Sequence, residues 1–189
     1  MQENLFIFVG MKKKILAISG STRKDSSNLQ IIKAIAELAG VQYDMEIYSD
    51  LALLPHFNPD IDKEGATPKI IEDLRSKIST ADGILICTPE YVFSLPGSLK
   101  NAIEWMVSTT LFSHKPVAII TAAASGEKAH ESLLLIMKTL EAKLSPKSQL
   151  LISGVRAKVS STGEIKDEPT LNRIKELISD FTRVLNAIE

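Results

Sequence analysis

The stretch KILAISGSTRKDSSN, residues 14–28, joins a short apolar run to a loop of hydroxyl side chains and then to a helical pattern. The run KILAIS (14–19) is nearly continuous in apolar residues, which is typical of a parallel strand covered on both faces. The loop after it holds serine and threonine hydroxyls, Arg23 and one glycine, Gly20. From about Asn28 onward, apolar residues recur at helical spacing. The stretch therefore predicts a strand, a polar loop and a helix.

The same alternation of apolar run and helical pattern continues to the end of the chain. The predicted strands cover residues 14–19, 42–48, 83–88, 116–122 and 148–153, and the helical patterns cover 29–39, 70–78, 99–106, 133–144 and 171–185. The second strand alternates apolar and polar residues, as an edge strand does. Parallel strands joined by right-handed crossovers give an α/β fold. We predict a flavodoxin-like three-layer sandwich with a five-stranded parallel sheet of order 2-1-3-4-5.

Length and composition indicate one domain. The chain has 189 residues, of which 44% are hydrophobic and 24% charged, enough for a complete core. The predicted domain covers residues 11–189. Residues 1–10 are treated apart, because ENLFIFVG is similar to a protease-cleavable, non-native leader. The alternative is that the apolar residues 5–9 form an extra edge strand or an apolar contact.

Charge and cysteine content exclude several function classes. The formal charge is −1, from 22 basic and 23 acidic residues, which argues against a nucleic-acid partner. No apolar run approaches the roughly 18 to 20 residues of a membrane span, so no membrane association is expected. The single cysteine, Cys87, cannot form an internal disulfide, favours the reducing cytoplasm and is expected in the core. His56, His114 and His130 are too scattered for a metal site, so no metal is expected.

The loop after the first strand is predicted to bind an anion. It lies where the winding of the sheet reverses, next to a helix start whose free amides and dipole favour negative charge. Arg23 adds a planar cation, and hydroxyls are available from Ser19, Ser21, Thr22, Ser26 and Ser27. The dinucleotide and Walker fingerprints are absent, which disfavours a nucleoside triphosphate. The alternative is that Ser26 or Ser27 only caps the helix and Arg23 is solvated.

A second loop, TPEYVFSLPGSLKNAIEW (88–105), follows the third strand at the same edge of the sheet. Pro89 and Pro96 stiffen this loop, and Gly97 permits close approach of a ligand. Residues 90–93 offer backbone amides beside an aromatic ring. Together with a phosphate loop, this segment predicts a ligand that has a phosphate at one end and a flat ring at the other.

The two loops together resemble the NADPH-dependent FMN reductase family. GSTRKDSSN matches its phosphate loop and PEYVFSLPGSLKNAIEW matches its flavin-ring loop, within a resemblance that covers residues 11–189. The resemblance implies FMN as cofactor and NADPH or NADH as reductant. Hydride would pass to the flavin and then to a quinone, azo compound, metal oxyanion or free flavin. Because the flavin carries this chemistry, no catalytic residue is predicted.

The resemblance also implies which residues contact the cofactor. Ser21, Arg23, Ser26 and Asn28 match phosphate-binding positions, with Ser19 and Ser27 nearby, while Pro89, Glu90, Tyr91 and Val92 match positions along the ring, and Ser125 and Gly126 follow the fourth strand. The position of Val92 is commonly asparagine in the family. The resemblance further implies a homodimer or a dimer of dimers, with the flavin near the subunit boundary and the segment through Trp105 helping to form it.

Two other function classes stay open on the sequence. One is a non-enzymatic flavodoxin-like electron carrier or FMN-binding module, in which the ring face is covered. The other is a scaffold that has lost its affinity for flavin. The small residues 122–125 leave room above a ring, which favours the enzyme. The sequence leaves open the electron acceptor, the choice between NADH and NADPH, and the oligomer.

Overall fold

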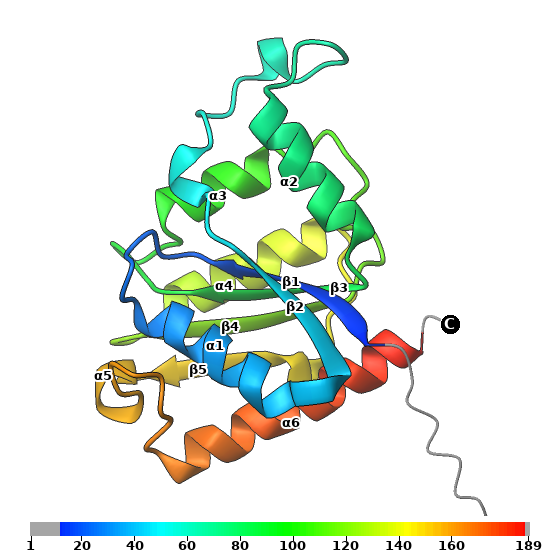
Figure 1. Cartoon of the computed structure of the whole chain (residues 1–189). Helices are drawn as coiled ribbons and strands as arrows, with labels where there is room; N and C mark the ends of the chain where they lie inside the picture. Colours follow the sequence, from blue (N-terminus) through cyan, green and yellow to red (C-terminus); the bar gives the residue numbers. More distant parts are fainter. Residues whose placement is uncertain (1–11, 188–189) are drawn as a thin grey trace, which may run out of the picture.

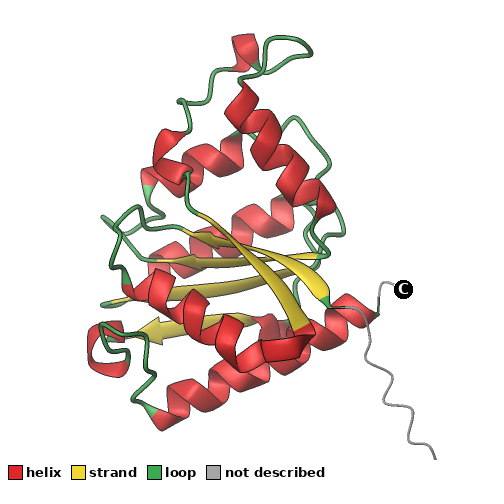
Figure 2. Ribbon diagram, viewed as in Figure 1, coloured by secondary structure: helices red, strands yellow, loops and turns green. Residues whose placement is uncertain are grey.

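Five parallel strands form one sheet at the centre of the computed structural model, which describes residues 12–187 (Figures 1 and 2). The predicted leader, residues 1–10, and its alternative role as an edge strand lie outside the described residues. The strands are β1 (Lys13–Ser19), β2 (Tyr43–Tyr48), β3 (Gly83–Thr88), β4 (Val117–Ala123) and β5 (Gln149–Ser153). Their order is β2-β1-β3-β4-β5, so the predicted topology is confirmed, and β2 is an edge strand as expected.

Helices cover both faces of this sheet (Figure 1). The helices are α1 (Ser27–Ala39), α2 (Lys69–Thr80), α3 (Gly97–Glu104), α4 (Glu127–Thr139), α5 (Val155–Lys158) and α6 (Glu168–Asn186), and short 3-10 turns lie at Gly40–Gln42, Leu51–Leu53, Pro59–Ile61 and Pro146–Ser148. Helices α1 and α6 pack on one face, and α2, α3 and α4 pack on the other.

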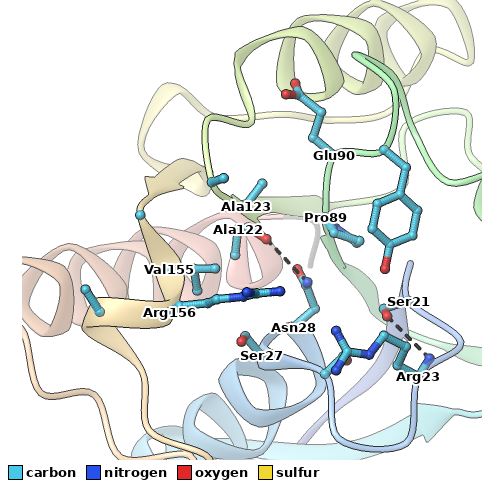
Figure 3. A pocket seen from close by; sticks show the side chains of 15 residues that line it. Ser21, Arg23, Ser27, Asn28, Pro89, Glu90, Ala122, Ala123, Val155 and Arg156 are labelled. Atoms are coloured by element: carbon cyan, nitrogen blue, oxygen red, sulfur yellow. Dashed lines mark hydrogen bonds between the residues drawn. The ribbon is translucent and has the colours of Figure 1, made fainter.

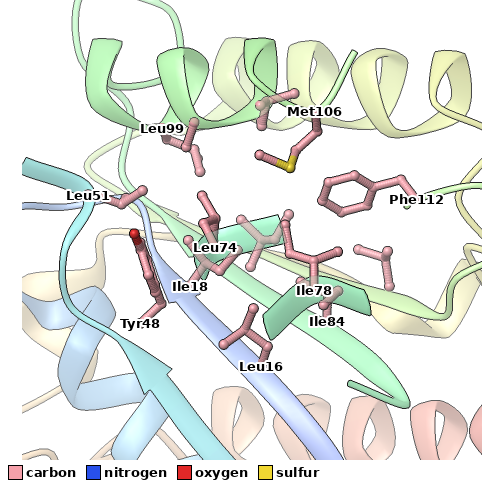
Figure 4. Packing of buried hydrophobic residues seen from close by; sticks show 14 of the residues in the cluster. Leu16, Ile18, Tyr48, Leu51, Leu74, Ile78, Ile84, Leu99, Met106 and Phe112 are labelled. Carbon is pink, nitrogen blue, oxygen red and sulfur yellow. The ribbon is translucent and has the colours of Figure 1, made fainter. Parts of the chain in front are cut away.

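Alternation along the central strands divides the core into two apolar clusters. Leu16 and Ile18 of β1 point to the cluster under α2, α3 and α4, which Figure 4 shows in close-up. Ile15 and Ala17 point to the cluster under α1 and α6. Because both faces are covered, the strand reads as a continuous apolar run rather than as an alternating one. Cys87 is completely buried in the second cluster, as expected.

Two helical details differ from the sequence pattern. The apolar spacing predicted one helix through residue 144, but α4 ends at Thr139. The chain reverses there, because Glu141 adopts φ +59° and the amide of Ala142 donates to the carbonyl of Met137 at 2.9 Å. The short helix α5 after β5 was not predicted. It follows Gly154, which has φ +67°, a left-handed conformation that glycine adopts at little cost.

The strand register aligns the loops at one edge of the sheet. Ser19 at the end of β1 pairs with Cys87 of β3, and Thr88 pairs with Thr121 of β4. The two strand ends approach so closely that a Cβ atom at Gly20 would lie 2.3 Å from Oγ1 of Thr88. The glycine of the first loop is therefore required by packing of the chain against itself.

Candidate functional site

A cavity of about 580 Å³ opens at the carboxyl ends of β1, β3, β4 and β5 (Figure 3). Its volume lies within the usual range for small-molecule sites. It is lined by Ser21, Arg23, Ser26, Ser27, Asn28, Pro89, Glu90, Tyr91, Ala122, Ala123, Ala124, Gly154, Val155, Arg156 and Ala157. Four chain segments at the carboxyl ends of four different strands therefore form one site, at the edge where the topology predicts ligand binding.

The first wall is the loop into α1. Ser26 caps the helix, because its hydroxyl accepts a hydrogen bond from the amide of Leu29 at 3.1 Å. The structure thus shows the capping role, which the sequence left open as the alternative to anion binding, and the Ser26 hydroxyl keeps its own proton to donate. A helix start leaves its first amides without intrahelical partners. The cap uses the Leu29 amide, so the amides of Ser27 and Asn28 remain suited to an anion.

Asn28 fixes the start of α1 over the sheet. Its side-chain amide donates to the carbonyl of Ala122 at 3.3 Å, and its carbonyl oxygen accepts from the thiol of Cys87 at 3.3 Å. Burial raises the pKa of the Cys87 thiol well above its usual range, which keeps the thiol protonated as a donor. The Asn28 side chain thus links α1 to β3 and β4.

The second wall is the loop after β3. Pro89, Glu90 and Tyr91 line the cavity. The Glu90 carboxylate accepts hydrogen bonds from the amides of Gly126 at 3.3 Å and Ala129 at 2.9 Å, so it caps the first turn of α4. This acid therefore joins the second wall of the cavity to the segment after β4.

The tip of the same loop is a tight turn from Tyr91 to Ser94. Each of these two residues donates its amide to the carbonyl of the other, at 3.0 and 3.1 Å. The central residues Val92 and Phe93 have φ +50° and +58°. Left-handed backbone is costly for a β-branched residue and is tolerated better by asparagine. The turn geometry thus favours asparagine over the valine that this chain has at position 92.

Two arginines supply the net positive charge of the cavity. Arg23 belongs to the first loop, and Arg156 belongs to α5. Figure 3 shows the Arg156 side chain reaching into the cavity toward Ser27 and Asn28. The remaining charged residue of the lining, Glu90, is engaged by the start of α4. The site is therefore electrostatically suited to an anionic ligand.

The structure gathers eight of the twelve predicted contact residues around the cavity. They are Ser21, Arg23, Ser26, Ser27, Asn28, Pro89, Glu90 and Tyr91. Ser19, Val92, Ser125 and Gly126 are not part of the lining. Ser19 is buried, with its hydroxyl donating to the carbonyl of Ser21 at 3.2 Å, and the Val92 side chain is 93% exposed at the turn tip.

The fourth wall, residues 154–157, was missed by sequence reasoning. The signal that could have found it is topological, because the loop after β5 ends at the same edge as the other binding loops. The third wall is formed by the alanines 122–124, which were expected to leave room above a ring.

Two further properties concern residues 12–187 as a whole. Within this range, no group of three or more His, Cys, Asp or Glu side chains is placed to hold a metal ion. None of the helices described is long and apolar enough to cross a membrane.

Comparison with known proteins identifies the family. The family model "NADPH-dependent FMN reductase" matches residues 13–157. A quinone reductase of Escherichia coli K12 is 29% identical over 184 residues, covering 94% of this chain and 98% of the relative. An NADPH:quinone oxidoreductase of Arabidopsis thaliana is 31% identical over 175 residues, covering 87% of this chain and 88% of the relative.

A solved structure supports the same assignment. The flavoenzyme NAD(P)H:(acceptor) oxidoreductase from Paracoccus denitrificans superposes with a TM-score of 0.79 at 25% identity, covering 93% of this chain and 98% of that one. The fold, the two loops and the family match agree. The chain belongs to the NADPH-dependent FMN reductase family.

Proposed function

We propose that this protein is an FMN-dependent NAD(P)H oxidoreductase. The observation that carries the proposal is the layout of the cavity. Helix α1 and Arg23 provide an anion-binding end, while Pro89 and Tyr91 provide a stiff wall of flat side chains. A phosphorylated flavin needs these two environments in one site. Membership of the family supports FMN as the group that occupies it.

The residues of the chain would bind and orient the cofactor. The amides of Ser27 and Asn28 and the guanidinium of Arg23 would hold the phosphate. Pro89 and Tyr91 would contact the ring from one wall, and the alanines 122–124 would leave its other side accessible to a nicotinamide. Once bound, FMN supplies the hydride and electron-transfer chemistry. The proposed work of the protein is therefore positioning.

The finer assignments follow from the relatives. The relatives in Escherichia coli and Arabidopsis thaliana are a quinone reductase and an NADPH:quinone oxidoreductase. We therefore propose a quinone as the electron acceptor, with NADPH or NADH as reductant. We also propose that the protein acts in the cytoplasm, which the free, buried thiol of Cys87 supports, and that it forms a homodimer or a dimer of dimers.

The reductase is tested by anaerobic mixing of FMN-loaded protein with NADH or NADPH. We expect the flavin absorbance to bleach within seconds, because the alanine wall leaves space for a stacked nicotinamide at the general near-attack distance of about 3 to 3.5 Å. Ser125→Trp places a large ring beside this wall, so we expect slow bleaching with FMN still bound. The matched control is Ser79→Trp, because Ser79 is an exposed serine at the end of α2 and does not line the cavity.

The competing carrier function gives a different result. A carrier would stay yellow with both nicotinamides and yet be reduced rapidly by dithionite. That outcome would reject the reductase and leave the carrier. A scaffold without flavin affinity would neither become yellow nor quench the fluorescence of added FMN.

A further inference from the structure

Arg156 lies in the cavity but in neither of the two loops that carry the family resemblance. The chain contains five arginines, all within residues 12–187. The guanidinium groups of Arg75, Arg173 and Arg183 donate hydrogen bonds to protein oxygens. In the described part of the chain, those of Arg23 and Arg156 make no hydrogen bond or ion pair with protein groups, and both line the cavity.

The two free guanidinium groups come from different walls. Arg23 precedes α1, whereas Arg156 is on α5 and reaches into the cavity toward Ser27 and Asn28 (Figure 3). An arginine is a planar cation that pairs well with phosphate oxygens. A phosphate at the start of α1 would therefore have one arginine on each side.

The charge balance of the lining indicates which anion fits. Two cations face the cavity, and its single carboxylate, Glu90, already accepts two amides of α4. Lys24 and Asp25 also belong to the first loop but do not line the cavity. A phosphate monoester, whose second pKa is about 6, carries close to two negative charges at pH 7 and balances the two arginines.

We infer that Arg156 is a second phosphate-binding residue, which makes the site selective for a flavin with a terminal phosphate monoester. FMN has such a group, FAD has a diphosphate bridge without a terminal phosphate, and riboflavin has no phosphate. The inference rests on the flavin site of the proposed function. It adds a contact from α5, the wall that sequence reasoning missed.

The test compares Arg156→Gln with Lys158→Gln by calorimetry. Lys158 is the matched control, because it is also a cation of α5 but does not line the cavity. For Arg156→Gln we expect FMN to bind roughly 10- to 100-fold more weakly, the effect of one lost charge-assisted hydrogen bond, and riboflavin to bind almost unchanged. The preference for FMN over FAD should shrink. Lys158→Gln should bind all three flavins like the unaltered protein.

Phosphorus NMR gives a readout that a purely structural role would not move. Paired with Arg156, the phosphate of bound FMN should stay doubly charged to a lower pH than in free FMN. In Arg156→Gln its pKa should shift back toward about 6. The affinities of both variants for NADPH and NADH are measured by calorimetry as well. NADPH carries a 2′-phosphate, which is the other phosphate monoester that Arg156 could bind.

Each alternative result overturns the inference. Equal weakening of FMN and riboflavin would mean that Arg156 supports packing. A loss of calorimetric affinity for NADPH alone, with FMN affinity intact, would move the contact of Arg156 to the 2′-phosphate of the nicotinamide cofactor. If Arg156→Gln bound all three flavins as tightly as Lys158→Gln does, the phosphate would be held by Arg23 and the start of α1 alone. These measurements need no turnover, so a protein that binds FMN but does not oxidise nicotinamide rejects the reductase without rejecting the role of Arg156.

Discussion

Glu90 shows how a single residue can join two walls of the site. Its carboxylate accepts the amides of Gly126 and Ala129, which are otherwise unsatisfied donors at the start of α4. A negative group at a helix start is also favoured by the helix dipole. Although the resemblance placed Glu90 along the flavin ring, the structure gives it this second task of holding the β4–α4 segment in place.

Replacing Glu90 with alanine should destabilise the protein. The change leaves two amides of α4 without a partner, so we expect a loss of about 1–3 kcal/mol in the free energy of unfolding. Glu90→Gln keeps one acceptor oxygen and should lose less. Urea denaturation measures both, with Glu127→Gln as control, because Glu127 is an exposed acid in the same helical turn. Equal stability of Glu90→Ala and the control would contradict the capping role.

At the scale of elements, two buried tyrosines of β2 behave differently. The hydroxyl of Tyr43 donates to the carbonyl of Ile178 at 3.1 Å and lies 2.9 Å from the hydroxyl of Thr182, so it ties β2 to α6. Its ring packs edge-on against Phe181. The hydroxyl of Tyr48, at the other end of β2, has no hydrogen-bond partner among the described residues. The hydroxyl of Tyr43 thus strengthens the contact between β2 and α6, whereas the hydroxyl of Tyr48 is a buried polar atom without a hydrogen bond among the described residues.

The same substitution should therefore have unequal effects at these two positions. Tyr43→Phe removes a satisfied hydrogen bond and should lower the free energy of unfolding by about 1 kcal/mol. Tyr48→Phe removes an unpaired hydroxyl and should be neutral or stabilising. Thermal and urea unfolding of the two variants test this difference. A larger loss at Tyr48 would mean that its hydroxyl has a partner in solution.

Alkaline pH should weaken the fold through the same two residues. Burial raises the pKa of Tyr43 and of Tyr48 to about 12, from about 10 in an unfolded chain. Because the raised value favours the neutral phenol, their contribution is complete below pH 10 and is lost as the pH rises from 10 toward 12. Unfolding midpoints between pH 8 and 11 measure this loss. The loss should be smaller in both phenylalanine variants, and an unchanged slope would contradict the assignment.

Most strands and helices were predictable, because burial of a strand or of a helix face leaves an apolar pattern within the segment itself. Strands buried on both faces, such as β3 and β4, read as apolar runs, and the bounds of β1, β3, β4 and β5 agree with the sequence to within one residue. Helix α5 was not predictable from periodicity, since four residues give no repeat, and it starts after a left-handed glycine. Arg156 was missed with it. The end of α4 was also missed, because Leu140 and Leu144 continue the apolar spacing beyond the turn at Glu141.

At the scale of the whole molecule, the exposed apolar tip of the ring loop indicates where two copies would meet. Phe93 is 79% exposed beside Val92, although both are apolar and held in left-handed backbone. Strained backbone at a functional site persists when its surroundings fix it. Trp105, which was expected to help form the interface, is buried within the subunit and donates to the carbonyl of Pro55 at 2.9 Å. We therefore assign the proposed contact to the turn tip.

Light scattering at micromolar concentration tests this assembly. We expect a dimer or tetramer for the unaltered protein and a shift toward monomer for Phe93→Asp, because a charge in an apolar contact is costly to bury. Val41→Asp is the control, since Val41 is as exposed as Phe93 but lies at the opposite end of α1 from the cavity. A monomer at all concentrations would rule out the proposed dimer. Dissociation by both variants would place the interface elsewhere.

The four-walled cavity also fixes when a newly made chain can capture its cofactor. The lining begins at Ser21 and is complete only with Ala157, and the strand before that last wall packs against α6, which ends at Asn186. Synthesis proceeds from the amino terminus at about 5–20 residues per second, so the phosphate loop leaves the ribosome several seconds before the wall opposite it. Full FMN affinity thus has to await release of the chain through α6, so cofactor loading follows synthesis of the whole flavodoxin-like domain.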